Sequence, residues 1–121
     1  MMQPRQEVML NAITATTTSG GFAINNASRL SIQVKAASIT SGNCVFTIQV
    51  SNDGTNWTAY NRIVSNVTNT NAQTDTKVAS VTLSSNGTAM LFFPDNDTFA
   101  FIRIIGTVTT DGTYQAVGYF N

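Results

Sequence analysis

RLSIQVKAA, residues 29–37, has an apolar side chain at every second position. Successive side chains of an extended strand point to opposite faces, so the apolar side chains share one face and the polar ones share the other. This alternation predicts a β-strand with one buried and one solvated face. The apolar face consists of Leu30, Ile32, Val34 and Ala36.

The same alternation returns in CVFTIQVS, residues 44–51. The turn-forming residues Ser41-Gly42-Asn43 separate the two runs, which predicts that they pair as neighbouring antiparallel strands. The alternation in these runs and in residues 77–83 also predicts which side chains form the core. The predicted core residues are Leu30, Ile32, Val34, Cys44, Phe46, Ile48, Val50, Val81 and Leu83.

Further strands are expected along the chain, each bounded by turn-forming Gly, Asn, Asp or Pro residues. They are expected at residues 57–64, 77–83, 88–93, 99–109 and 113–120. No segment shows the periodicity of a capped helix. The sequence therefore predicts an all-β fold, an antiparallel β-sandwich of roughly seven to eight strands that is jelly-roll-like or immunoglobulin-like.

The first 28 residues read differently from the rest. Residues 8–13 are expected to form one short strand, and Thr14–Gly21 has the small polar residues of a flexible linker. We therefore predict an N-terminal arm and linker over residues 1–28 and a β-sandwich domain over residues 29–121. A merely frayed N-terminus is the alternative.

SNDGTNW, residues 51–57, contains a tight-turn signal. Asn52, Asp53 and Gly54 tolerate the positive φ values that hairpin turns require. We expect Gly54 to have a positive φ, the turn to join adjacent antiparallel strands, and Trp57 to open the second strand.

Residues 90–93 and 99–105 are apolar at consecutive positions, and therefore on both faces of a strand. A two-layer sandwich buries one face of each sheet, so a second apolar face needs a cover. The cover is either a loop of the same chain or a second subunit or partner. The residues assigned to this interface are Leu91, Phe93, Ile102 and Ile104.

The composition excludes most catalytic sites. With no His and one Cys among 121 residues, Ser-His-Asp and Cys-His arrangements and ordinary zinc sites are excluded. All the Asp residues lie in predicted turns, where Asp is favoured for its hydrogen bonds. We expect no catalytic residues, no cofactor and no metal site. Asp95-Asn96-Asp97 has oxygens that suit Ca²⁺ but lacks the other ligands of an EF-hand loop.

The number and balance of charged residues limit the kinds of binding partner that can be expected. Six Lys and Arg balance six Asp and Glu, and only 10% of residues are charged. Nucleic acid and anionic membranes need a clustered positive field, so neither is expected as a partner. A neutral surface resists self-association weakly, which favours a homo-oligomer. Cys44 is expected to be an inert buried thiol, and the absence of a signal-peptide-like run predicts synthesis in a cytoplasm.

Two resemblances accompany these patterns. The Ser51–Trp57 turn resembles the Ser-x-Asp-Gly-x-x-Trp hairpin of discoidin-type domains, over that hairpin alone. A broader set of features resembles the small β-sandwich proteins of tailed-bacteriophage virions. These are the Thr/Ser/Gly-rich opening, the strand-turn-strand of residues 30–57, the Asn/Thr-rich loop at 65–76 and the Thr-Asp-Gly-Thr-Tyr hairpin at 110–114.

The phage resemblance implies a non-enzymatic virion protein, such as a capsid decoration protein or a vertex- or tail-associated protein. It would be made in the host cytoplasm and would bind capsid or other virion proteins. The alternative is a carbohydrate-binding β-sandwich module whose binding end is formed by the loops around Trp57 and Asp95. Its stacking side chains would be Trp57, Tyr60, Tyr114 and Tyr119, although such aromatics also serve as core or interface residues.

Overall fold

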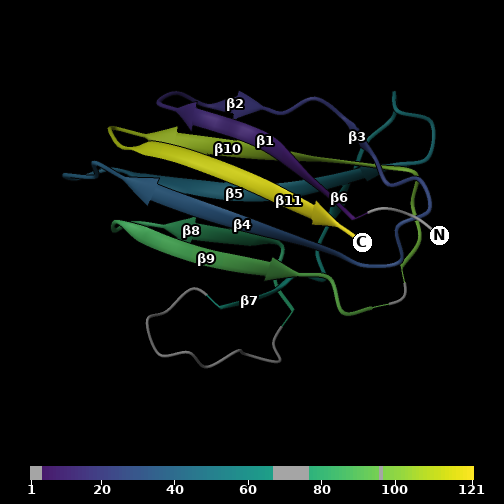
Figure 1. The fold of residues 1–121 in the computed structure, drawn as a ribbon. Coiled ribbons are helices and arrows are strands. Elements are labelled where there is room, and N and C mark those ends of the chain that lie inside the picture. Colours follow the sequence, from purple (N-terminus) through teal and green to yellow (C-terminus); the bar gives the residue numbers. More distant parts are fainter. Residues whose placement is uncertain (1–3, 67–76, 96) are drawn as a thin grey trace.

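The computed structural model describes residues 4–66, 77–95 and 97–121. In this part of the chain two antiparallel sheets pack face to face and no helix is present, so no helix there is long and apolar enough to cross a membrane (Figure 1). The prediction of an all-β antiparallel sandwich is confirmed. From residue 67 on, the Asn/Thr-rich loop expected at 65–76 lies outside the described residues.

One sheet has five strands in the order β1-β11-β4-β9-β7. Figure 1 shows β1, β11, β4 and β9 side by side in one layer. The last strand pairs with β4 without interruption, from Thr113 opposite Ala37 to Phe120 opposite Leu30. The strand bounds are β1 Arg5–Ile13, β4 Leu30–Ala37, β7 Val64–Asn66, β9 Gly87–Phe92 and β11 Thr113–Phe120.

The other sheet has six strands, in which β2-β10-β5-β6 form the main order, β3 also pairs with β10, and β8 also pairs with β5. Its centre is the pairing of β10 with β5, from Phe101 opposite Ser51 to Thr109 opposite Asn43. The bounds are β2 Thr17–Thr18, β3 Phe22–Ala23, β5 Asn43–Ser51, β6 Thr58–Tyr60, β8 Ser80–Leu83 and β10 Phe101–Thr109.

The connectivity is that of a jelly roll. Because β2 and β3 share one neighbour, and β6 and β8 share another, each of these pairs occupies a single strand position. The six-stranded sheet then has four strand positions, the five-stranded sheet has four and the short edge strand β7, and nearly every connection passes from one sheet to the other. This alternation, with the first and last strands adjacent, distinguishes the double Greek key from an immunoglobulin sandwich. It also explains why more strands are present than the sequence predicted.

The predicted pairing of residues 29–37 with residues 44–51 is wrong. β4 pairs with β11 and β9, whereas β5 pairs with β10, β6 and β8, so the two runs lie in opposite sheets. The connecting loop is held by the carboxylate of Asp111, which accepts hydrogen bonds from the backbone N–H groups of Thr40, Ser41 and Gly42. Turn-forming residues suit such an arch as well as they suit a hairpin.

The N-terminal region is part of the sandwich rather than an arm or a frayed end. β1 pairs with β11, and β2 and β3 pair with β10, so residues 5–23 contribute to both sheets. A register shift between Val8 and Leu10 interrupts the alternation of β1. As a result the consecutive residues Met9 and Leu10 are both buried. This bulge breaks the period-2 alternation of the strand, of which the sequence predicted residues 8–13.

The predicted core is largely confirmed. Seven of the nine residues are buried, and Leu30 and Val50 are partly buried against the same cluster. Cys44 is fully buried, and burial raises the pKa of its thiol to about 12, so the thiol stays neutral. At the centre the rings of Phe46 and Tyr114 meet edge to face, with centroids 6.3 Å apart.

The two faces of the doubly apolar strands are exchanged relative to the prediction. Leu91, Ile102 and Ile104 are fully buried between the sheets and are therefore core residues. Phe93 is partly buried at one end of the sandwich. The side chains that point outward from the same strands are only partly buried, and they are Met90, Phe92, Phe101 and Ile105.

Candidate functional site

The turn at residues 51–57 is stabilised by two side chains. Ser51 Oγ accepts hydrogen bonds from the backbone N–H groups of Asp53 and Gly54, at 3.2 and 2.9 Å. Asp53 Oδ1 in turn accepts from the N–H groups of Thr55 and Asn56, both at 2.8 Å. These bonds to Asn56 and Thr55 hold the pKa of Asp53 well below its usual range.

The backbone of this turn agrees with the prediction. Gly54 has φ of +76°, and the turn joins adjacent antiparallel strands, since Val50 of β5 pairs with Thr58 of β6. Asn52 adds a longer connection, because its Oδ1 accepts a hydrogen bond from the backbone N–H of Ala100 at 3.1 Å. The turn is thus fixed to the segment that leads into β10.

Trp57 lies over the outer face of the six-stranded sheet. The Arg103 guanidinium stacks on its ring at 4.3 Å from the centroid, and Arg103 Nε donates to Gln49 Oε1 at 2.7 Å. The ring also lies against Gly21, and Gly54 of the same turn lies over Phe101. The turn therefore covers part of this sheet's apolar outer face with the chain's own residues.

A groove lies at the end of the sandwich, where the turn, the β3–β4 connection and residues 93–95 and 97–99 meet. It has two adjoining hollows that share Tyr60, Asp97, Thr98 and Phe99. We call the pair of hollows the end groove. It includes Asp95, one of the two residues around which the binding end was expected.

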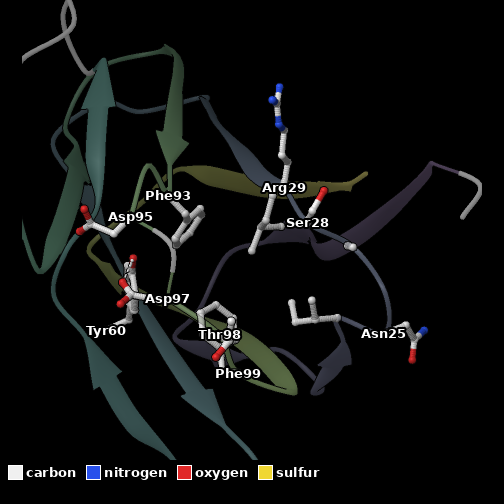
Figure 2. A pocket seen from close by; sticks show the side chains of 12 residues that line it. Asn25, Ser28, Arg29, Tyr60, Phe93, Asp95, Asp97, Thr98 and Phe99 are labelled. Atoms are coloured by element: carbon white, nitrogen blue, oxygen red, sulfur yellow. Dashed lines mark hydrogen bonds between the residues drawn. The ribbon is translucent and has the colours of Figure 1, made fainter.

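The first hollow of the end groove, of about 400 Å³, has a largely apolar wall. Figure 2 shows the Phe93 ring directed toward the middle of the lining residues, while the guanidinium of Arg29 and the amide of Asn25 point outward. Its apolar lining residues are Ile24, Ala27, Leu30, Tyr60, Phe93 and Phe99.

The second hollow, of about 250 Å³, has more polar than apolar lining residues. It lies on the side of the 51–57 turn, so the turn supplies part of its wall. Its polar lining residues are Ser51, Asn52, Asn56, Thr58, Tyr60, Arg62, Asp97 and Thr98.

A chain of ion pairs borders the groove. Asp97 Oδ2 accepts hydrogen bonds from Tyr60 Oη and Arg62 Nε, each at 2.9 Å. Lys77 Nζ donates to Asp95 Oδ1 at 2.9 Å, and Arg62 Nε is 3.6 Å from Asp95 Oδ2. The hydrogen bond from Arg62 holds the pKa of Asp97 below its usual value, whereas burial raises that of Tyr60 to about 12. At neutral pH Tyr60 therefore keeps its hydroxyl proton and donates a hydrogen bond, and the Asp97 carboxylate is ionised.

The Asp95-Asn96-Asp97 segment has oxygens that suit Ca²⁺. Asn96 lies outside the described residues. Asp95 and Asp97 are each paired with cations of the same chain. Within residues 4–66, 77–95 and 97–121, no three carboxylate, His or Cys side chains are grouped so as to hold a metal ion.

The four aromatic residues that would form the stacking platform of a carbohydrate-binding module do not converge. Tyr60 and Tyr114 are buried in the core, and Trp57 is stacked under Arg103. Tyr119 is 47% exposed on the outer face of the other sheet. Instead, Phe93 and Phe99 line the groove with Tyr60. Their role was missed because they come from irregular connections, and their only signal is the aromatic residues flanking Pro94–Asp97.

The outer face of the five-stranded sheet is a second candidate surface, which we call the flat face. Two adjacent rows of paired residues cross β1, β11, β4 and β9, and neither contains a charge. Val8 and Tyr119, at 52% and 47% exposure, lie in these rows. The rows are Val8-Val117-Gln33-Met90 and Gln6-Tyr119-Ser31-Phe92.

The chain shares its fold with proteins of known structure. No protein-family model matches it, and no curated protein matches it significantly in sequence. The SPBc2 prophage-derived protein YomS superposes with a TM-score of 0.55 at 12% identity, over 98% of this chain and 96% of that one. PirA superposes with a TM-score of 0.50 at 10% identity, over 100% and 95%. At these identities the similarity shows a common fold, one that a prophage-derived protein also has.

Proposed function

We propose that this chain is a non-enzymatic structural protein of a bacteriophage virion, of the capsid decoration or vertex- or tail-associated kind. It attaches to a lattice of virion proteins and acts as a homo-oligomer. The observation that carries this proposal is the flat face, where two adjacent rows of uncharged side chains include Val8 and Tyr119, the large hydrophobic side chains that are exposed among the described residues.

The flat face fits a protein partner. Val8 and Val117 lie directly opposite each other, and Met90 and Phe92 extend the apolar area beyond β4. Amide and hydroxyl side chains lie between them, a mixture typical of protein–protein contacts rather than of a membrane or nucleic-acid surface. Contiguous apolar patches on a neutral protein mark such contacts.

The comparisons support the phage setting. A prophage-derived protein has this fold along almost its whole length, and the described residues offer no cluster of metal ligands around which a reaction could be built. The full sequence contains no His, which leaves the common general base absent. A structural role requires only a stable fold and a surface that contacts other proteins.

The test is quantitative mass spectrometry of phage particles purified from the source host. The expected result is this chain in a fixed copy number per particle, in simple proportion to the major capsid or tail protein. Its presence in infected cells but not in purified particles would contradict the proposal, as would a copy number that varies between preparations.

A further inference from the structure

We propose that the end groove is a binding site for a neutral glycan. This inference does not depend on the flat face or on attachment to a virion, because the groove lies at one end of the sandwich and the flat face lies on an outer surface. A sugar ring has one apolar C–H surface and a rim of hydroxyl groups that both donate and accept hydrogen bonds. The two hollows of the groove match these two requirements.

The apolar requirement is met by the partly buried rings of Phe93 and Phe99, which are fixed in place because they pack against the buried ring of Tyr60. The ring centroid of Tyr60 is 5.4 Å from that of Phe93 and 6.0 Å from that of Phe99. The Tyr60 hydroxyl is held by Asp97, which prevents the ring from turning away. Preorganised aromatic side chains bury ligand surface with little loss of conformational entropy.

The polar requirement is met by side chains whose hydrogen-bonding capacity is only half used. Asn52 accepts from Ala100 through Oδ1, so its Nδ2 group is left to donate. Asn56 donates to Asp53 through Nδ2, so its Oδ1 is left to accept. Neither remaining group has a hydrogen-bond partner within the described residues. The exposed hydroxyl groups of Thr58 and Thr98 add two groups that both donate and accept.

The local charge favours a neutral ligand. Arg62 and Lys77 balance Asp95 and Asp97 through ion pairs of 2.9 Å, and Arg29, which also lines the first hollow, points its guanidinium outward. An anionic ligand would meet both carboxylates, and a cationic one would meet both cations. A sugar without acidic or amino groups is repelled neither by the carboxylates nor by the cations.

The test uses the purified full-length chain and a panel of neutral oligosaccharides built from glucose, galactose, mannose and N-acetylglucosamine. Binding is measured by calorimetry and by backbone amide chemical shifts. At least one oligosaccharide is expected to bind with a millimolar or tighter Kd. The shift changes should be confined to residues 50–62 and 93–99.

Two substitutions test the site with matched controls. Thr98 is exposed and lies between the two hollows, so Thr98→Trp should block both and weaken binding by about tenfold or more, a free-energy change of about 1.4 kcal/mol. Thr58→Ala removes one hydroxyl and should weaken binding a few-fold. Thr82 is exposed on β8 and lines neither hollow, so Thr82→Trp and Thr82→Ala should leave the Kd unchanged.

Four outcomes would overturn the inference. They are no binding by any oligosaccharide at 10 mM, shift changes outside the groove, equal weakening by the Thr82 controls, and binding only of charged sugars or of an unglycosylated peptide. None of them bears on particle incorporation, so failure here and failure of the virion proposal are distinguishable.

Discussion

The backbone N–H of Gly42 donates a hydrogen bond to Asp111 Oδ1 at 2.9 Å, which ties together two connections that are 69 residues apart in sequence. Both connections pass between the sheets, one from β4 to β5 and the other from β10 to β11. A Cβ atom at position 42 would overlap the backbone of Asp111 and the carbonyl of Thr109. The absence of a side chain at Gly42 is therefore a requirement of the close approach.

We expect Gly42→Ala to lower the free energy of unfolding by about 2 kcal/mol or more, because backbone atoms on two connections must move apart. Gly20 is the matched control, since nothing lies within 4 Å of a Cβ built there. Gly20→Ala should change stability by less than about 0.5 kcal/mol. Urea denaturation measures both. Equal stabilities for the two variants would show that the approach at Gly42 is not tight.

Acid should weaken the same contact. Hydrogen bonds from the N–H groups of Thr40, Gly42 and Ser41 hold the pKa of Asp111 below its usual value. A carboxyl with a lowered pKa in the folded state stabilises the fold above its unfolded pKa of about 3.9, and this contribution is lost as the pH falls through the folded value. Asp111→Asn should therefore be less stable at pH 7 and should lose less stability on acidification. Urea midpoints at about pH 7 and pH 3 measure this; an unchanged pH dependence would refute it.

Gly54 is expected to tolerate Asn but not Val. Its φ of +76° strains β-branched residues, whereas Asn adopts this conformation more readily. Space is not the limit, because a Cβ there would be 3.6 Å from the Phe101 ring. Gly54→Val should cost about 1–3 kcal/mol and Gly54→Asn distinctly less, as measured by thermal unfolding. A Val variant as stable as the Asn variant would contradict the strain argument.

Phe46 is fully buried and makes an edge contact with Tyr114, so its truncation leaves a cavity between the two sheets. Phe46→Ala should lower the free energy of unfolding by about 3–5 kcal/mol. Phe46→Leu fills most of the cavity and should cost distinctly less. Chemical denaturation measures both, and a small loss for the Ala variant would mean that the core collapses around the site.

The flat face should control assembly without affecting folding. Val8 and Tyr119 are exposed in the single chain, so Val8→Asp and Tyr119→Asp together should keep the wild-type unfolding temperature to within a few degrees while abolishing self-association. Thr107→Asp, on the outer face of the other sheet, is the control that should still assemble. Light scattering measures the mass. A wild-type chain that stays monomeric at high concentration would remove the homo-oligomer from the proposal.

Alternation in the sequence predicted the strands well where it was regular. The last strand has the predicted bounds, residues 113–120, and residues 29–37 and 44–51 form strands that differ from their predicted bounds by one residue. Which strands pair with each other was not predictable in the same way. An arch that joins two sheets and a hairpin within a single sheet use the same turn residues. β1 was predicted only in part, over residues 8–13, and a bulge between Val8 and Leu10 breaks its period.

Burial was predictable only where one face was polar. In residues 101–105 both sets of side chains are apolar except Arg103, so the pattern did not say which face turns inward. The end groove was harder still. Phe93, Thr98 and Phe99 lie outside the strands, and only the jelly-roll connectivity brings them to the 51–57 turn. Such a site depends on long-range topology, which local periodicity does not carry.

The position of β11 between β1 and β4 has a consequence for how the protein folds. β1 and β4 are synthesised early, but they cannot complete their pairing until residues 113–120 have been made and have inserted between them. During synthesis both neighbours expose an unpaired edge that invites other chains to pair with it. Folding that depends on such distant pairings is slow, so the chain is most vulnerable to aggregation on the ribosome, before its final strand arrives.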